Sequence, residues 1–191
     1  MSELYENRNS GVFMAPKFPV MAVILMVFAL ICSFIPLAAN FGYQRFTAYL
    51  YFIAMLLIFV GLVLHKVKMQ ILTGIGTLIL AAYNIYTAVN SVYYMATGYA
   101  NGWIICDLFI SLLAIAAFTV TGLHYVLKRP KPGKSAKLIL MIPLACLTLV
   151  YVIVRAIGSM SYYNPAFLLL MGLSDMLMFF ALMIYTPFRE A

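Results

Sequence analysis

The chain has 191 residues, of which 66% are hydrophobic and only 9% charged, and its mean hydropathy is +1.05. Soluble domains are about 45–50% apolar and about 25% charged, so this chain lacks the polar surface that a water-soluble globule of its size needs. The composition excludes a soluble enzyme, a disordered chain and a disulfide-stabilised scaffold. It indicates one integral membrane domain over residues 1–191, with the lipid bilayer as its surroundings.

Six apolar runs are long enough to cross a bilayer, which takes about 20 residues. The runs are continuous rather than alternating, which favours helices over the strands of a barrel. The first run is longer than the core of a signal peptide, so we expect it to be retained as a span. We predict an all-α integral membrane protein, a bundle of six transmembrane helices. In chain order the runs cover residues 18–38, 48–65, 70–91, 103–126, 138–158 and 166–187.

The positive charges are distributed unevenly between the connections. Ten of the twelve Lys and Arg residues fall in the N-terminal segment, the second and fourth connections and the C-terminus, and only Arg45 and Arg155 fall toward the other side. Positive loops stay cytoplasmic, so we expect a plasma-membrane protein with both termini inside. The net charge of +7 therefore indicates topology and contact with anionic headgroups, not a nucleic-acid partner. The ten residues are Arg8, Lys17, Lys66, Lys68, Lys128, Arg129, Lys131, Lys134, Lys137 and Arg189.

The run at 70–91 has one face of small and polar residues at steps of three and four. Such a face lets helices approach closely in lipid, so it predicts either a dry packing seam or the wall of a lined cavity at the bundle centre. A weaker face of the same kind follows the run at 138–158. The first face consists of Gly74, Thr77, Ala81, Asn84, Ala88 and Ser91, and the second of Ala145, Thr148, Val152, Arg155 and Ser159.

Two opposite charges lie at matching depth in the runs at 103–126 and 138–158. At about 1.5 Å per residue, Asp107 lies roughly 6 Å below Trp103, and Arg155 lies roughly 5 Å from the end of its run at Gly158. A charge at the bilayer centre costs roughly 2.5–3.5 kcal/mol on insertion scales and needs a partner. We expect an Asp107–Arg155 ion pair, which is either a structural staple or part of a substrate or ion site.

Asp175 stands near the middle of the run at 166–187, with no basic residue at its depth. Hydrocarbon favours the neutral, protonated carboxyl, and the side chain should point into the bundle. By depth its best partner is Asn84. Asp175 is then either a proton-carrying group for coupled transport or a neutral carboxyl that hydrogen-bonds across helices.

An internal repeat is one interpretation of the apolar runs. Segments 83–91 and 151–159 share four identical residues at a constant offset of 68. Three helical hairpins, each crossing the membrane and returning, would explain this pattern. Chance similarity between apolar helices would explain it equally.

Signatures of enzymes, metals and cofactors are absent. The two histidines, His65 and His124, stand at predicted inner helix ends, where histidine usually serves as a polar tip. The three cysteines lie inside apolar runs without metal-ligand spacing. We therefore expect neither catalysis, nor a metal, nor a cofactor.

Two functions remain open. The first is handling of a small solute or ion by a transporter, a channel or an importer subunit, with Asp107, Arg155, Asp175 and Asn84 as its site. In size and topology the chain resembles the substrate-binding subunits of vitamin importers of the energy-coupling type. So small a protein has little room to alternate access alone, so a homo-oligomer or other membrane subunits are expected.

The second function is that of a non-catalytic accessory, stress-response or immunity protein that acts through helix–helix contacts. Three outward hairpins with short loops also resemble the HdeD-like acid-stress membrane proteins in size and topology. A lipid-modifying enzyme is disfavoured, because the predicted inner interface offers histidines and lysines without a carboxylate.

Overall fold

The computed structural model describes residues 19–39, 46–64, 70–99, 101–127, 133–158 and 165–185. Within these ranges the chain forms six helices, each long and apolar enough to cross a membrane, which confirms the predicted all-α membrane bundle. Helix ends differ from prediction most where α4 runs on to Ala96 and α6 begins at Gly133. The helices are α2 (Val20–Ala39), α3 (Phe46–Leu64), α4 (Gln70–Ala96), α5 (Gly102–Leu127), α6 (Gly133–Gly158) and α7 (Pro165–Ile184).

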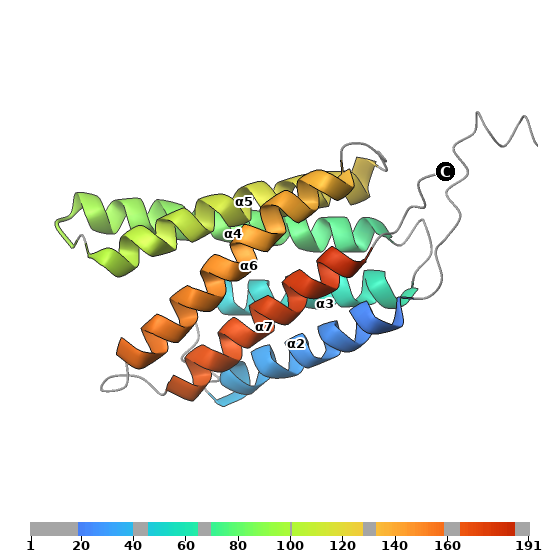
Figure 1. Cartoon of the computed structure of the whole chain (residues 1–191), viewed down its shortest axis with the longest axis horizontal. Helices are drawn as coiled ribbons and strands as arrows, with labels where there is room; N and C mark the ends of the chain where they lie inside the picture. The colour runs from blue at the N-terminus through green and yellow to red at the C-terminus, as the bar shows by residue number, and fades with distance from the viewer. Residues whose placement is uncertain are drawn as a thin grey trace, which may run out of the picture.

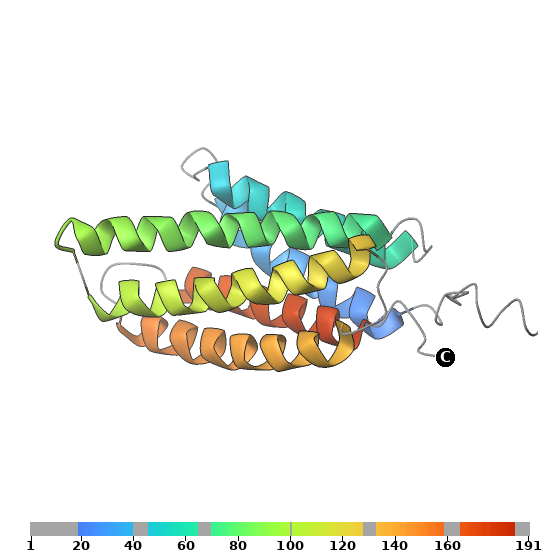
Figure 2. The same cartoon turned by 90° about the horizontal axis from the view of Figure 1, so that it is seen from above.

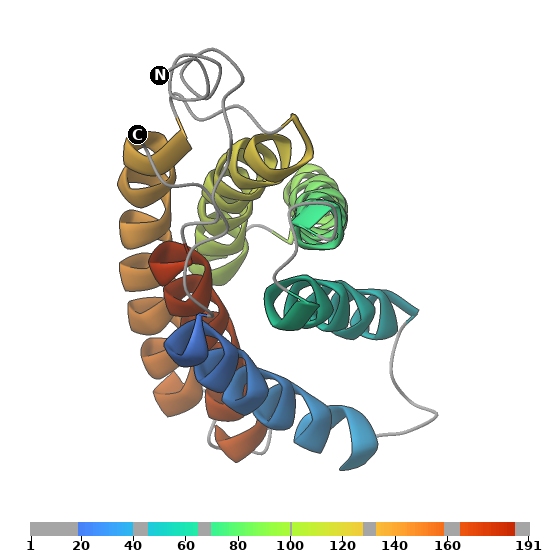
Figure 3. The same ribbon diagram turned by 90° about the vertical axis from the view of Figure 1, so that its right-hand side faces the viewer.

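The six helices form a closed ring (Figure 3). Each helix packs against its neighbours in the sequence, and α2 closes the ring by packing against α7. Successive helices run in opposite directions, so the start of α2 and the end of α7 lie at the same end of the bundle (Figure 1). All ten basic residues behind the predicted orientation lie outside the residues whose side chains are described. The cytoplasmic position of the termini therefore remains a prediction.

Helices α4 and α5 form a long, tightly connected hairpin (Figure 2). At the end of α4 the Tyr99 N–H donates to the Tyr94 carbonyl and the Gly98 N–H to the Met95 carbonyl, at 3.0 and 3.3 Å. This is the Schellman ending, which requires a left-handed residue, and Gly98 supplies it with φ of 87°. The next helix begins at once, because the Asn101 side chain accepts from the Ile104 N–H at 3.0 Å.

Small residues on two sides of α4 set its distances to both neighbours. A Cβ on Gly74 would lie 3.1 Å from the Gly122 carbonyl oxygen of α5, and a Cβ on Gly76 would lie 2.6 Å from the Ala54 carbonyl oxygen of α3. Backbones this close are typical of membrane helices that meet at small residues. Five of the six members of the predicted small and polar face are buried, namely Gly74, Thr77, Ala81, Ala88 and Ser91, and Asn84 is half-buried.

The apolar core fills one half of the bundle along its length, toward the end where α2 starts and α7 ends. Its largest fully buried side chains include Tyr125 on α5 and Tyr185 just beyond α7, whose ring centroids lie 5.8 Å apart. On the α2 side, the Ser174 hydroxyl donates to the Ala29 carbonyl at 2.8 Å and joins α7 to α2. The outward faces carry exposed aliphatic and aromatic residues on all six helices, as a lipid-facing surface requires.

Candidate functional site

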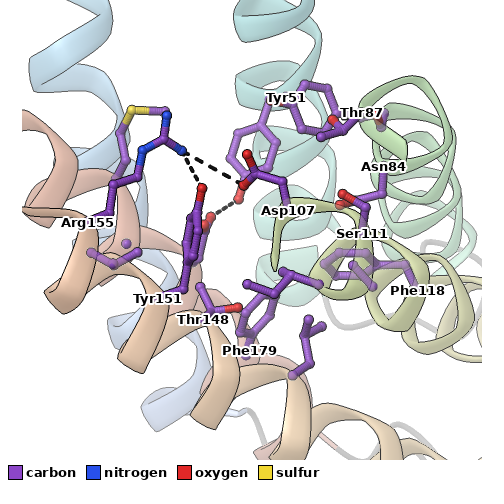
Figure 4. Close-up of a pocket in the computed structure, with 18 of the residues that line it drawn as sticks. Tyr51, Asn84, Thr87, Asp107, Ser111, Phe118, Thr148, Tyr151, Arg155 and Phe179 are labelled. Atoms are coloured by element: carbon purple, nitrogen blue, oxygen red, sulfur yellow. Dashed lines mark hydrogen bonds and ion pairs between the residues drawn. The ribbon is translucent and has the colours of Figure 1, made fainter. Parts of the chain in front are cut away.

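The other half of the bundle, toward the α4–α5 turn, contains a cavity of about 230 Å³ (Figure 4). The described lining residues come from five of the six helices, and none of them belongs to α2. All four residues that the sequence marks as a tentative site line this one cavity, although they come from four different helices. The lining consists of Tyr51, Tyr83, Asn84, Thr87, Asp107, Ile110, Ser111, Ala114, Phe118, Leu144, Thr148, Tyr151, Val152, Arg155, Leu168, Met171, Gly172, Asp175 and Phe179.

Three helices present the cavity with regular stripes at steps of three and four. On α5 the stripe runs from Asp107 to Phe118, on α6 from Leu144 to Arg155, and on α7 from Leu168 to Phe179. Each stripe covers twelve residues, whose eleven steps rise about 16 Å along the helix. The hydrocarbon core of a bilayer is about 30 Å thick, so the lining spans about half of it.

The first polar group of the cavity is the ion pair expected from the sequence. Arg155 Nη1 lies 3.8 Å from Asp107 Oδ1 and donates to the Tyr151 hydroxyl at 2.5 Å. The Arg155 guanidinium also lies 5.5 Å from the Tyr151 ring centroid, and the Trp103 ring packs against that ring at 5.9 Å. The Arg155 and Asp107 side chains are 42% and 32% exposed, which places the mouth of the cavity here.

The second polar group joins α3 to α7 deeper in the bundle. Asp175 faces the cavity, as its expected inward orientation requires, and accepts a hydrogen bond from the Tyr51 hydroxyl. The Tyr51 ring packs edge-on against Tyr83 with centroids 5.3 Å apart. A carboxyl and two phenols therefore meet at one level of the bundle and line the cavity there.

Asn84 was predicted as the partner of Asp175, and this prediction is wrong. Both side chains line the cavity, but the Asn84 Nδ2 donates to the Leu80 carbonyl of its own helix at 2.8 Å. The glycine end of the α4 face packs against α5 rather than α7, because Gly74 meets Gly122 and Tyr125 there. Asn84 therefore lines the same cavity as Asp175 without the hydrogen bond that was expected between them.

Aromatic rings close the deep end of the cavity. Phe118 of α5 and Phe179 of α7 are both buried and lie 5.8 Å apart between ring centroids. Ala117 and Thr121, on the same helix as Phe118, are fully buried and do not line the cavity. The described part of the structure therefore defines a cavity with a polar mouth and an apolar floor.

Several cavity residues were missed from the sequence. Tyr151 precedes Arg155 by one helical turn, and Ser111 follows Asp107 by one turn, so helical spacing from the charges could have identified both. Tyr51 had no such signal, because the distance of 124 residues to its partner Asp175 leaves no local pattern.

No group of three potential metal ligands occurs among the residues that the structure describes. His65 lies outside those residues. His124 packs against Tyr125, with ring centroids 5.5 Å apart, in the half of the bundle away from the cavity. The polar groups of the described lining residues are carboxyl, guanidinium, phenol, hydroxyl and amide groups.

Comparison with known protein families, with curated proteins and with solved structures finds no match. The two resemblances drawn from the sequence therefore rest on size and topology alone.

Proposed function

We propose that this protein binds a small polar solute or ion in the ring cavity and handles it as a transporter, a channel or an importer subunit. The observation that carries the proposal is the convergence of Asp107, Arg155, Asp175 and Asn84 on one cavity of about 230 Å³. At about 30 Å³ per water molecule, this volume corresponds to roughly seven or eight waters, which suits a small metabolite.

A purely structural role explains these residues less well. A staple between α5 and α6 needs only the Asp107–Arg155 pair, whereas the cavity adds a second acid, Asp175, about 15 Å into α7 from its start at Pro165. Ionisable groups inside membranes are costly, and they typically mark substrate paths or proton relays. A dry seam between helices would also leave no open volume beside them.

The closed floor at Phe118 and Phe179 constrains the mechanism. A solute entering at the Asp107–Arg155 mouth would pass only if α5 and α7 separate at these two rings. We propose that a second copy of the chain or another membrane subunit supports this movement, because each helix of a single copy already packs against two neighbours. The positive-inside distribution would place the mouth on the outer side of the plasma membrane.

A flux assay tests the proposal. Purified protein is reconstituted in vesicles, and the uptake of a panel of small labelled solutes is compared between wild type, Asp175→Asn and Ser174→Ala. Ser174 is the matched control, because it neighbours Asp175 on α7 but faces Ala29 of α2. We expect saturable uptake of one solute class that Asp175→Asn removes and Ser174→Ala retains.

If no solute shows saturable uptake or binding, or if both variants behave alike, the cavity is structural. The accessory interpretation, in which the protein acts only through helix–helix contacts, would then be favoured.

A further inference from the structure

The charges that line the cavity do not balance. Among the lining residues that the structure describes, two acids, Asp107 and Asp175, face one base, Arg155. Arg155 is engaged by Asp107 and by the Tyr151 hydroxyl. The partner described for Asp175 is a neutral phenol, Tyr51. With Asp175 ionised, the described lining therefore has one excess negative charge, which lies at the deeper level of the cavity.

Two aromatic rings lie beside that charge. Five of the nineteen described lining residues are Tyr or Phe, and the Tyr51 and Tyr83 rings meet edge-on beside Asp175. The negative faces of aromatic rings attract cations, most strongly where water is excluded. A carboxylate beside phenol rings is a combination suited to an ammonium group with an apolar substituent.

Other ligand classes fit less well. An anion would meet Asp175 without a free cation among the described lining residues. A divalent metal would want three or more strong ligands, and no group of three His, Cys, Asp or Glu side chains occurs in the described part of the chain. The deep end, with Phe118, Phe179 and Leu144, offers apolar contacts that a bare ion cannot use.

We infer that the ligand is a small monovalent organic cation, whose ammonium group pairs with Asp175 in the cavity beside the Tyr51–Tyr83 ring pair while its apolar part lies toward Phe118 and Phe179. This inference rests on the proposed function and specifies its substrate class. Tyr51 is a positioning residue in this arrangement, because its hydroxyl holds the Asp175 carboxyl in place.

Three probes of nearly equal size test the inference: benzylammonium, benzyl alcohol and benzoate. Their binding to the purified full chain in lipid nanodiscs is measured by isothermal titration calorimetry, with sodium chloride as a fourth, inorganic probe. Charge-assisted hydrogen bonds are stronger than hydrogen bonds between neutral groups. Benzylammonium should therefore bind at least about tenfold more tightly than benzyl alcohol. Benzoate should bind most weakly of the three.

Variants then assign the preference to Asp175. In Asp175→Asn the ratio between benzylammonium and benzyl alcohol should fall to about threefold or less, and in the neighbouring control Ser174→Ala it should stay as in wild type. If Asp175→Asn does not fold, the ranking of the probes by the wild-type protein decides alone. Equal binding of alcohol and ammonium, tighter binding of benzoate, binding of sodium only, or no binding of any probe would overturn the inference.

The proposed function fails by a different result, the absence of saturable uptake across the whole solute panel. Uptake of a neutral or anionic solute would keep the proposed function and reject the cation.

Discussion

The hydrogen bond from Tyr51 to Asp175 is the contact on which the inner part of the cavity depends. A phenol on α3 reaches a carboxyl on α7, although these helices are not neighbours in the ring. Because a buried acceptor that loses its donor keeps its desolvation penalty, we expect this contact to be coupled energetically.

A double-mutant cycle measures the coupling. Tyr51→Phe should lower the free energy of unfolding by about 1–3 kcal/mol in the wild-type background, because it leaves the carboxyl without its hydroxyl donor. The same change should cost less in the Asp175→Asn background, since an amide tolerates the loss better than a carboxylate. Tyr86→Phe is the control, because Tyr86 is 48% exposed on the outside of α4 and should change stability little. Additive effects of the Tyr51 and Asp175 changes would show that the bond contributes nothing.

The depth of a residue along its helix predicted the ion pair and the inward direction of Asp175, but it did not predict the neutral partner of Asp175. Matching depths predicted the Asp107–Arg155 pair, and the cost of a carboxyl in lipid predicted the inward direction of Asp175. Matching depth also predicted Asn84 as the hydrogen-bond partner of Asp175. The Asn84 side chain instead donates to the Leu80 carbonyl of its own helix. The sequence did not mark Tyr51 as a partner of Asp175, because a tyrosine among apolar residues is common in membrane helices and does not by itself indicate a buried hydrogen bond.

At the scale of elements, the bundle depends on close approach at glycines. Helix α4 meets α5 through Gly74 and Gly122, and it meets α3 through Gly76 and Gly61. Periodicity revealed only the first of these contacts, because the predicted face of α4 continues through polar residues and Gly76 falls on another side. The second interface of α4 is defined by its contact with α3, so the pattern of α4 alone could not predict it.

Replacing Gly76 tests this packing. A Cβ there would lie 2.6 Å from the Ala54 carbonyl oxygen and 2.8 Å from Ile58 Cγ1, and a backbone oxygen cannot rotate away. Gly76→Ala should therefore push α3 from α4 and lower the free energy of unfolding in mixed micelles by about 1–3 kcal/mol. It should also weaken ligand binding, because Tyr51 lies one turn from Ala54.

The matched control is Gly102→Ala at the start of α5, where a Cβ would meet nothing within 4 Å. This change should leave stability unchanged or raise it by up to about 1 kcal/mol, because alanine favours helix more than glycine does. Equal effects of the two substitutions would mean that close approach at Gly76 does not hold the ring together.

At the scale of the whole molecule, short connections predict that helices adjacent in the sequence pack together. They do not predict the contact between α2 and α7 that closes the ring. Helices joined by a few residues must be antiparallel neighbours, as α3 and α4 are across residues 65–69. The contact between α2 and α7 joins the two ends of the chain, and no local pattern announces it. The weak repeat neither required nor excluded this closure.

Cysteine labelling tests the orientation in the membrane. In a background without the three native cysteines, a cysteine at Tyr99 in the α4–α5 turn should react from outside intact cells, and one at Ser135 should react only after permeabilisation. Tyr99 suits the label because it is 70% exposed, whereas Gly98 needs its positive φ of 87°. The reverse pattern would invert the bundle and place the cavity mouth in the cytoplasm.

The proposed function requires that water reaches the cavity from the outer side and stops at Phe118 and Phe179. Three cysteine substitutions along α5 measure it directly, with a membrane-impermeant thiosulfonate reagent applied to intact cells. Ile110 is half-buried and lines the cavity, Leu112 faces outward with 52% exposure, and Thr121 is fully buried beyond the floor. We expect rapid modification of Ile110→Cys and little modification of Leu112→Cys and Thr121→Cys. Failure of Ile110→Cys to react, or equal reaction at all three positions, would show that the cavity does not open to the outer side.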